Sequence, residues 1–362
     1  MYYKSLEDIK QSELIANYDS DSELMIYVAE ESADKLDEMM SWLNDKGVKY
    51  FGGIYPKLIA GAGMKEKGFI IKGLRPIYSE VARPFLMKRL PNLEADKSYT
   101  GIIITDGLSD KIDELIETVN LNNIRNLNIT GGCCGRYATD EYGTYSLENK
   151  ASIFDNNGLH RDILRLCIIE EVSQSNVFFG WEVMDGPYRI TSMKEKYICG
   201  IDNENPLELY QYAISQSAKL FISHDNFFAY ATSYPFATLE NGHIKNLIIP
   251  TEASTEGYFK LLHREISEEE EIYIVKADLD SFIHEFDKNI KDNGIASSEL
   301  TVFSCFTREV LLQEQYDKEI NYINKKYHMD AEGVLSFGEM TNKNDKMELR
   351  MLAGACVLVL SR

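Results

Sequence analysis

The chain has 362 residues, of which 44% are hydrophobic and 27% are charged, and this composition excludes disorder over most of its length. Lys and Arg total 38 against 58 Asp and Glu, a formal net charge of -20, so the surface repels phosphate backbones and disfavours a nucleic-acid partner. No apolar run approaches the ~18 to 20 residues of a membrane span, and the first residues lack the apolar core of a signal peptide. We therefore expect a cytoplasmic protein with no membrane span and, at about 150 residues per domain, two domains.

The six cysteines and six histidines give no sign of a metal centre. The cysteines form no CxxC pair, the histidines form no HExxH motif, and the chain is long enough to build its core without disulfides. We expect reduced thiols, no metal site and no cofactor.

A strand–helix–strand unit opens the regular structure. Leu24–Ala29 has the length and composition of a buried strand, and Glu31–Lys46 places apolar residues at helical spacing. Val48–Phe51 then predicts a second strand, which runs into Gly52 and Gly53.

The same pattern returns twice. The second unit predicts a strand at 101–105, a turn at Asp106 and Gly107, a helix at 110–119 and a strand at 127–130 that runs into Gly131 and Gly132. The third predicts a strand at 300–304, a helix at 308–327 and a strand with glycine at 333–338. Three such units indicate an α/β protein.

The middle of the chain has a different sequence pattern. Short apolar runs alternate with turn signals, which predicts antiparallel hairpins over 152–154, 164–169, 177–179, 188–191, 197–201, 229–234, 246–249, 257–262 and 272–276. The boundary is expected at 202–206, before a helix at Leu207–Ser217. The sequence thus predicts two α/β domains, 1–201 and 202–362, whose mixed sheets combine repeated strand–helix–strand units with antiparallel hairpins.

Ligands of such sheets collect beyond the carboxyl ends of the strands. The candidate ligand-binding residues at those ends are Gly52, Gly53, Asp106, Gly107, Gly131, Gly132, Cys133, Arg136, Cys305, Arg308 and Glu339.

The segment from Gly131 to Arg136 is the most specific of these signals. Its glycines leave backbone N–H groups unshielded, and Arg136 offers a guanidinium fork to a carboxylate. An anion pocket is one interpretation. The alternative is that the glycines let neighbouring strands approach closely.

Cys305 stands where a strand gives way to a helix, a position that favours ionisation of a thiol. It is a candidate nucleophile, although no histidine has a spacing that predicts pairing, and buried cysteines are common. Arg308 lies in the first helical turn, where the helix dipole disfavours a cation, so we expect an anionic partner such as Glu339 or a bound acid. A structural ion pair is the alternative.

Two further residues have a functional and a structural interpretation. Asp106 either contributes to a site or caps the helix that follows it. Trp181 either stacks on a ligand or belongs to the core.

An ordered series of short motifs carries a family resemblance. The motifs are Gly52-Gly53-Ile54-Tyr55-Pro56, Thr105-Asp106-Gly107-Leu108-Ser109, Gly131-Gly132-Cys133-Cys134-Gly135, Gly180-Trp181, Phe303-Ser304-Cys305-Phe306-Thr307-Arg308 and Phe337-Gly338-Glu339-Met340. Together they resemble the FIST family, with a FIST N domain over 1–201 and a FIST C domain over 202–362. The resemblance implies a stand-alone sensory module of signal transduction that binds a small molecule such as an amino acid and signals to a separate output protein.

We therefore expect a ligand-binding sensor rather than an enzyme. In this hypothesis Arg136 or Arg308 holds a carboxylate, the glycine-loop amides assist, and Trp181 covers the apolar part. The alternatives are a hydrolase or transferase that depends on Cys305, and a structural adaptor without a pocket.

Overall fold

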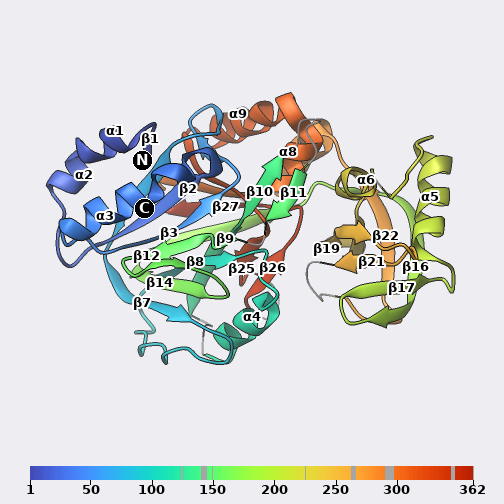
Figure 1. The fold of residues 1–362 in the computed structure, drawn as a ribbon, viewed down its shortest axis with the longest axis horizontal. Coiled ribbons are helices and arrows are strands. Elements are labelled where there is room, and N and C mark those ends of the chain that lie inside the picture. Colours follow the sequence, from blue (N-terminus) through green and yellow to red (C-terminus); the bar gives the residue numbers. More distant parts are fainter. Residues whose placement is uncertain are drawn as a thin grey trace.

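The computed structural model describes residues 1–361 apart from 123, 125, 140–144, 149, 225, 262–265, 290–296 and 344–346. In this part of the chain the strands form three six-stranded mixed sheets, one seven-stranded antiparallel sheet and a separate two-stranded hairpin (Figure 1). The expected α/β class, with mixed sheets and antiparallel hairpins, is confirmed. Among the described residues no helix has the length and apolarity that crossing a membrane requires.

Each six-stranded sheet is built on one parallel pair, whose strands are joined by a helical crossover. The first sheet has the order β1 (Tyr2–Tyr3), β6 (Phe69–Leu74), β2 (Glu23–Ala29), β3 (Tyr50–Tyr55), β12 (Ile153–Asp155) and β13 (Gly158–His160). Its parallel strands β2 and β3 are joined by η1 (Glu30–Lys35) and α3 (Leu36–Asp45). Two short helices precede it, α1 (Leu6–Lys10) and α2 (Glu13–Ala16).

The other two sheets repeat this plan. The second has the order β26 (Arg350–Leu352), β25 (Glu339–Thr341), β9 (Leu127–Cys134), β8 (Tyr99–Asp106), β14 (Leu164–Glu170) and β7 (Pro76–Ala82), with α4 (Ile112–Asn120) between the parallel β8 and β9. The third has the order β15 (Ser173–Phe178), β27 (Cys356–Ser361), β23 (Glu299–Cys305), β24 (Ala331–Ser336), β4 (Leu58–Ala60) and β5 (Gly63–Lys65). Its parallel strands β23 and β24 are joined by α8 (Phe306–Leu312), η2 (Gln313–Gln315) and α9 (Tyr316–Tyr327).

A glycine occupies the same position in all three parallel pairs. In each pair a side chain on one glycine of the second strand would collide with a carbonyl oxygen of the first. The distance from an added Cβ to that oxygen would be 2.1 Å for Gly52 and Ile26, 2.0 Å for Gly131 and Ile103, and 1.8 Å for Gly333 and Val302. The three glycines are therefore equivalent positions, and each residue of one parallel pair has a counterpart in the other two.

The outer hairpins exchange between sheets in a cycle. Hairpin β4–β5 follows β3 in the chain but pairs with β24 of the third sheet. Hairpin β12–β13 pairs with β3 of the first sheet, and β25–β26 pairs with β9 of the second. A shared core of buried side chains from all three sheets includes Tyr27, Ile104 and Phe303. The three sheets therefore enclose this core together.

The seven-stranded sheet forms the part of the molecule on the right of Figure 1. Its order is β19 (His243–Ile248), β18 (Phe236–Glu240), β22 (Glu271–Lys276), β16 (Glu182–Lys194), β17 (Tyr197–Ile201), β21 (Phe259–Leu261) and β20 (Pro250–Ala253), and α5 (Pro206–Ser217) and α6 (Phe227–Ser233) pack on it. The expected boundary after residue 201 falls at the end of β17, in the interior of this sheet. The chain leaves the sheet into α7 (Leu279–Asn289) and returns to β23.

Two sequence-based expectations of local structure are wrong. The run 229–234 belongs largely to helix α6, which buries Phe227 and Ala231 at helical spacing. The helix is too short for this period to be distinguished from a strand in the sequence. The helix expected over 308–327 is broken at Gln313, whose φ of 50° ends α8 before α9 begins.

Candidate functional site

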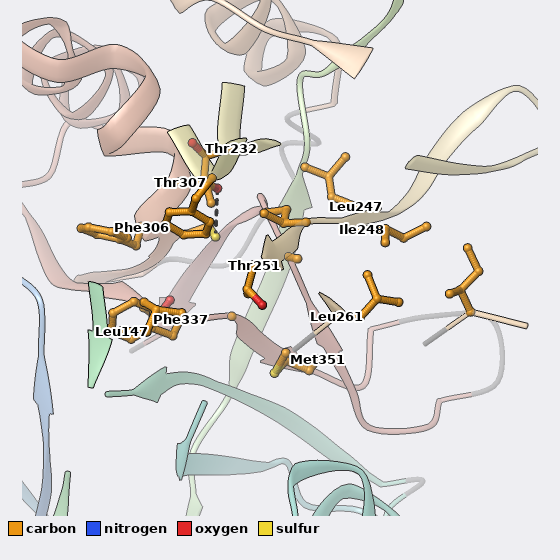
Figure 2. Close-up of a pocket in the computed structure, with 17 residues that line it drawn as sticks. Leu147, Thr232, Leu247, Ile248, Thr251, Leu261, Phe306, Thr307, Phe337 and Met351 are labelled. Carbon is orange, nitrogen blue, oxygen red and sulfur yellow. Dashed lines mark hydrogen bonds between the residues drawn. The ribbon is translucent and has the colours of Figure 1, made fainter. Parts of the chain in front are cut away.

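A pocket lies where the carboxyl ends of β23 and β24 meet the seven-stranded sheet (Figure 2). The third sheet and the segments after it contribute Cys305, Phe306, Thr307, Ser336, Phe337 and Gly338. The other side contributes Phe228 and Thr232 of α6 together with Leu247, Ile248, Thr251 and Leu261 of β19–β21. The lining also includes Met351 and Ala353, near the end of β26, and Leu147, from the hairpin of β10 (Arg136–Thr139) and β11 (Tyr145–Glu148).

The chemistry of this pocket is mainly apolar. Its volume is about 90 Å³. Since one water needs roughly 10–15 Å³, the pocket has room for a compact molecule of several non-hydrogen atoms. Its polar side chains are the hydroxyls of Thr232, Thr251, Thr307 and Ser336 and the thiol of Cys305, and no charged residue is among the described lining residues. Few polar groups on an apolar wall are typical of small-molecule sites.

Cys305 lines the pocket, at the residue that precedes α8. Its Sγ accepts a hydrogen bond from Thr307 Oγ1 at 3.1 Å, drawn as a dashed line in Figure 2. Burial raises the pKa of the Cys305 thiol to about 12, and Glu339 acts in the same direction once it is ionised. The expectation that this thiol ionises easily is therefore wrong, because the loss of solvation raises its pKa by more than the start of the helix lowers it. A thiol that stays protonated is a poor nucleophile.

Glu339 lies directly behind the pocket wall, at the start of β25, with no solvent exposure. Its Oε1 accepts a hydrogen bond from Ser336 Oγ at 2.7 Å, and its Oε2 accepts one from the Ala355 N–H at 3.2 Å. Burial raises the pKa of this carboxyl well above its usual range, against the opposing effects of these two hydrogen bonds and of Arg308. The carboxyl group beside this pocket hydroxyl therefore keeps its proton to a higher pH than an exposed glutamate does.

Arg308 is a buried residue that pairs inside the protein. Its Nη2 forms an ion pair with Glu319 of α9, and its Nη1 donates to the Phe179 carbonyl at 2.8 Å. The guanidinium stacks on the Phe282 ring at 3.6 Å. The anionic partner is thus Glu319, not Glu339 or a ligand, and Arg308 does not line the pocket. The structural ion pair that we considered as the alternative accounts for its position.

Arg136 is likewise occupied by the chain's own carboxylate. Its Nε and Nη2 donate to Glu30 Oε1 at 2.9 and 2.8 Å, so the guanidinium fork that we expected to face a ligand faces Glu30 instead. Because Glu30 follows β2 and Arg136 follows β9, this pair links the first two sheets. The structure does not bring Arg136 to the pocket.

The glycines and Cys133 lie in packed backbone and do not line the pocket. Gly52, Gly53, Gly131 and Gly132 are interior residues of β3 and β9. A Cβ on Gly107 would lie 2.7 Å from the Cβ of Cys133, whose own N–H donates to the Gly338 carbonyl. Close approach of strands explains these glycines, as the alternative interpretation of the segment 131–136 foresaw.

Asp106 and Trp181 are buried as well. Asp106 Oδ1 accepts a hydrogen bond from the Leu108 N–H at 3.0 Å, whereas Oδ2 has no partner among the described residues. Burial raises the pKa of this carboxyl to about 6. Trp181 donates through Nε1 to the Gly354 carbonyl at 2.9 Å and packs against Phe282. Its role is in the core, next to the segment that carries Ala353.

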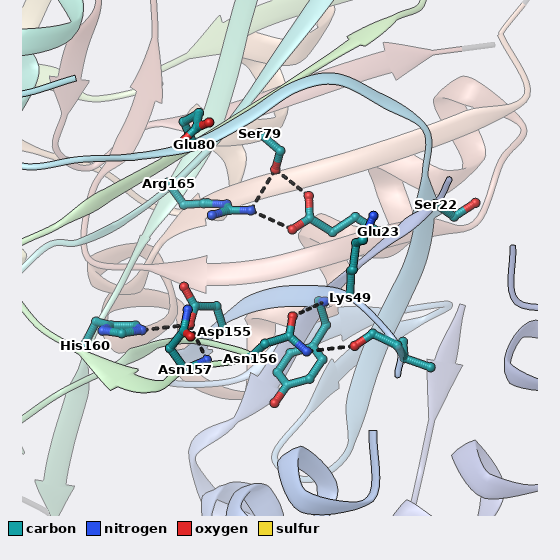
Figure 3. A network of polar contacts seen from close by, with 12 residues as sticks. Ser22, Glu23, Lys49, Ser79, Glu80, Asp155, Asn156, Asn157, His160 and Arg165 are labelled. Atoms are coloured by element: carbon teal, nitrogen blue, oxygen red, sulfur yellow. Dashed lines mark hydrogen bonds and ion pairs between the residues drawn. The ribbon is translucent and has the colours of Figure 1, made fainter. Parts of the chain in front are cut away.

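A second hollow has a polar lining (Figure 3). This cleft of about 700 Å³ lies beside the start of β2, β7 and β14. Arg165 Nη2 donates to Glu23 Oε1 at 2.6 Å and to Ser79 Oγ at 2.9 Å, and His160 Nε2 lies 2.9 Å from Asp155 Oδ1. Because its charged groups largely pair with one another, we place the candidate site in the apolar pocket.

Sequence reasoning missed most of the pocket. Ser336 could have been found, since it stands opposite Cys305 in the register of the third parallel pair. Thr232, Leu247 and Thr251 carried no signal, because residues on short apolar runs do not reveal which sheet end they will face.

Comparison with known proteins gives one family. No curated protein matches the chain. The FIST N domain matches residues 4–204, more than half of the 362 residues. FIST domains are sensory domains of signal transduction. By this match, which agrees with the ordered motifs of its sequence, the chain belongs to the FIST family.

Proposed function

We propose that this protein is a sensor that binds a small, uncharged and largely apolar molecule in the pocket between β23, β24 and the seven-stranded sheet. The observation that carries the proposal is a cavity of several non-hydrogen atoms with apolar walls, a few hydroxyls and no charge among its described lining residues. A purely structural adaptor needs no such cavity. Membership of a sensory family supports the same function.

The pocket favours a neutral ligand over the amino acid or small carboxylate that the family resemblance implies. A carboxylate enclosed there would lose its hydration without gaining a counter-charge, which is costly. Both arginines that were expected to supply that charge are paired with Glu30 and Glu319. We therefore rank neutral molecules first and keep amino acids as the comparison class.

The position of the pocket suggests how binding is reported. Its walls come mainly from the third sheet and the seven-stranded sheet, so a ligand that contacts both favours the arrangement that fits it best. We propose that this shift is passed to a separate signalling protein. A cytoplasmic location is part of the proposal, and it is supported by the fact that all six cysteines, each within the described residues, are free thiols.

Thermal unfolding in the presence of a compound panel tests the proposal. The panel contains compact ketones, alcohols and esters, with amino acids and short carboxylates as the charged set. A neutral compound at ~100 times its Kd should stabilise the protein by about 2.7 kcal/mol. Stabilisation by the charged set alone would overturn the assignment.

A pair of substitutions ties such binding to the pocket. Ala353→Leu fills space at the pocket wall and should abolish the stabilisation. Ala253→Leu, at an equally half-buried alanine of β20 outside the pocket, should leave it intact. Equal binding by both variants would place the ligand elsewhere.

A further inference from the structure

We propose that Ser336 recognises the ligand by donating a hydrogen bond to a carbonyl oxygen, and that Glu339 is the positioning residue that frees the Ser336 proton for this purpose. The inference rests on the proposed function, because it concerns the same pocket. It narrows the ligand class to small neutral carbonyl compounds, such as ketones, aldehydes, esters or lactones.

The repeated sheets show that the fold does not require a carboxyl group at position 339. Glu339 pairs with Gly132 of β9, and the counterparts of Gly132 are Gly53 and Val334. These pair with Ile153 in the first sheet and with Leu58 in the third. Both counterparts of Glu339 are apolar and fully buried or nearly so. Because a buried carboxyl costs stability at a site where Ile or Leu suffices, its presence points to a role beyond folding.

A count of protons and acceptors gives that role. The Ser336 hydroxyl has one proton and two acceptors within reach, Glu339 Oε1 at 2.7 Å and the Ser304 carbonyl at 3.3 Å. If Glu339 is ionised, the Ser336 hydroxyl donates its proton to the carboxylate, because this bond is the shorter of the two and is charge-assisted. If Glu339 is neutral, its own O–H donates to Ser336 Oγ. The Ser336 proton is then free to turn from the weak Ser304 acceptor to a carbonyl oxygen in the pocket.

The surroundings of Glu339 favour the neutral form. Burial raises its pKa, and the titratable groups around it, Cys305 of β23, Cys133 of β9 and Cys356 of β27, are buried thiols that offer a carboxylate no counter-charge. The Arg308 charge opposes the effect of burial, but this charge is neutralised by Glu319. Asp106 of β8 acts on Cys133 as Glu339 does and adds a negative charge once it ionises.

The experiment compares two probes of equal shape, cyclohexanone and methylenecyclohexane, in which C=O is replaced by C=CH₂. The readout is the ratio of their dissociation constants in the full chain, measured from pH 6 to pH 10. A neutral hydrogen bond corresponds to roughly a five-fold preference. We expect Ser336→Ala to lower the ketone preference by about that factor at pH 6. Ser175→Ala, the same substitution at a buried serine of β15 outside the pocket, should leave the ratio unchanged.

The role of Glu339 has its own readout. In the native protein the ketone preference should fall as the pH rises and Glu339 ionises. In Glu339→Gln the amide N–H₂ donates to Ser336 and the carbonyl accepts from Ala355, so the preference should stay constant with pH. Glu339→Ile, which introduces the side chain that Ile153 has at the equivalent position, gives a second variant compatible with the fold and should also be independent of pH.

Each contrary result has one meaning. A ketone preference that survives Ser336→Ala, or that is lost equally in Ser175→Ala, overturns the assignment of Ser336. A native preference that does not change with pH overturns the role of Glu339, while the pocket remains a ligand site. Absence of binding by either probe at every pH, while charged compounds bind, overturns the proposed function itself.

Discussion

Asp106 is fully buried at the end of β8, with one carboxylate oxygen that has no partner among the described residues. Burial raises its pKa to about 6 in the folded protein. Because the folded pKa lies above the unfolded one, the carboxyl costs no stability below about pH 4, and its full cost is reached above pH 6. Asp106→Asn keeps the acceptor for the Leu108 N–H. It should leave the free energy of unfolding unchanged at pH 4 and raise it by about 2–3 kcal/mol at pH 8.

Urea denaturation at the two pH values measures this effect. Asp110→Asn, at a highly exposed carboxylate of the same turn, is the control and should change stability little at either pH. A loss of stability in Asp106→Asn at pH 8 would contradict the prediction and would show that the ionised carboxylate has a stabilising partner.

The pair of Arg308 and Glu319 gives a second prediction at this scale. Both side chains are only 1% exposed, so removal of one leaves the other charge buried and unpaired. Arg308→Met should lower the free energy of unfolding by about 3–5 kcal/mol. Lys326→Met, which breaks the half-exposed pair with Asp287, should cost less than about 1 kcal/mol. Free energies of unfolding are measured by urea denaturation. Similar decreases in the two variants would show that the buried pair of Arg308 and Glu319 stabilises the protein no more than an exposed pair does.

At the scale of elements, the parallel pairs depend on their equivalent glycines. A Cβ on Gly131 would lie 2.0 Å from the Ile103 carbonyl oxygen, and β8 and β9 cannot separate without breaking their ladder. Gly131→Ala should therefore destabilise the protein by at least about 3 kcal/mol. Gly73→Ala is the matched control in strand β6, because its Cβ would approach a flexible leucine at 3.3 Å. A thermal midpoint for Gly131→Ala equal to that of the control would contradict the prediction.

The crossover units could be predicted from sequence because each one is local. Strand, helix and strand follow one another within about 40 residues, and the apolar period changes visibly between them. The exchanged hairpins could not be predicted, since nothing in Leu58–Ala60 indicates a partner as remote as β24. The site shows the same limit. Cys305 was found from its place after a strand, whereas the partner of Arg308 lies beyond an unforeseen break in the helix, at Glu319.

At the scale of the whole molecule, the cyclic exchange makes the three sheets depend on one another. The segment 1–204, which includes the FIST N match at residues 4–204, contains the first sheet. It lacks β25 and β26 of the second sheet and β23, β24 and β27 of the third, so hairpin β4–β5 and strand β15 are left without their partners. The division after residue 201, at the end of β17 in the seven-stranded sheet, stays a prediction.

We predict that a fragment of residues 1–204 does not fold cooperatively. Its urea transition, followed by circular dichroism, should be broad, and the fragment should associate through the exposed Leu58 and Ile59, which are fully buried in the full chain. The full chain is the control. A monomeric fragment with a sharp transition would show that the hairpin finds another partner.

The exchanged hairpin also has a consequence during synthesis. β4 and β5 leave the ribosome early, whereas their partner β24 begins only at Ala331. At roughly 5–20 residues per second, about 10–50 s pass between the synthesis of this hairpin and that of β24, although a hairpin itself forms within microseconds. For that interval an apolar sheet edge is exposed on the nascent chain. Chaperone supply during translation should therefore limit the yield of this protein more than the stability of the finished fold does.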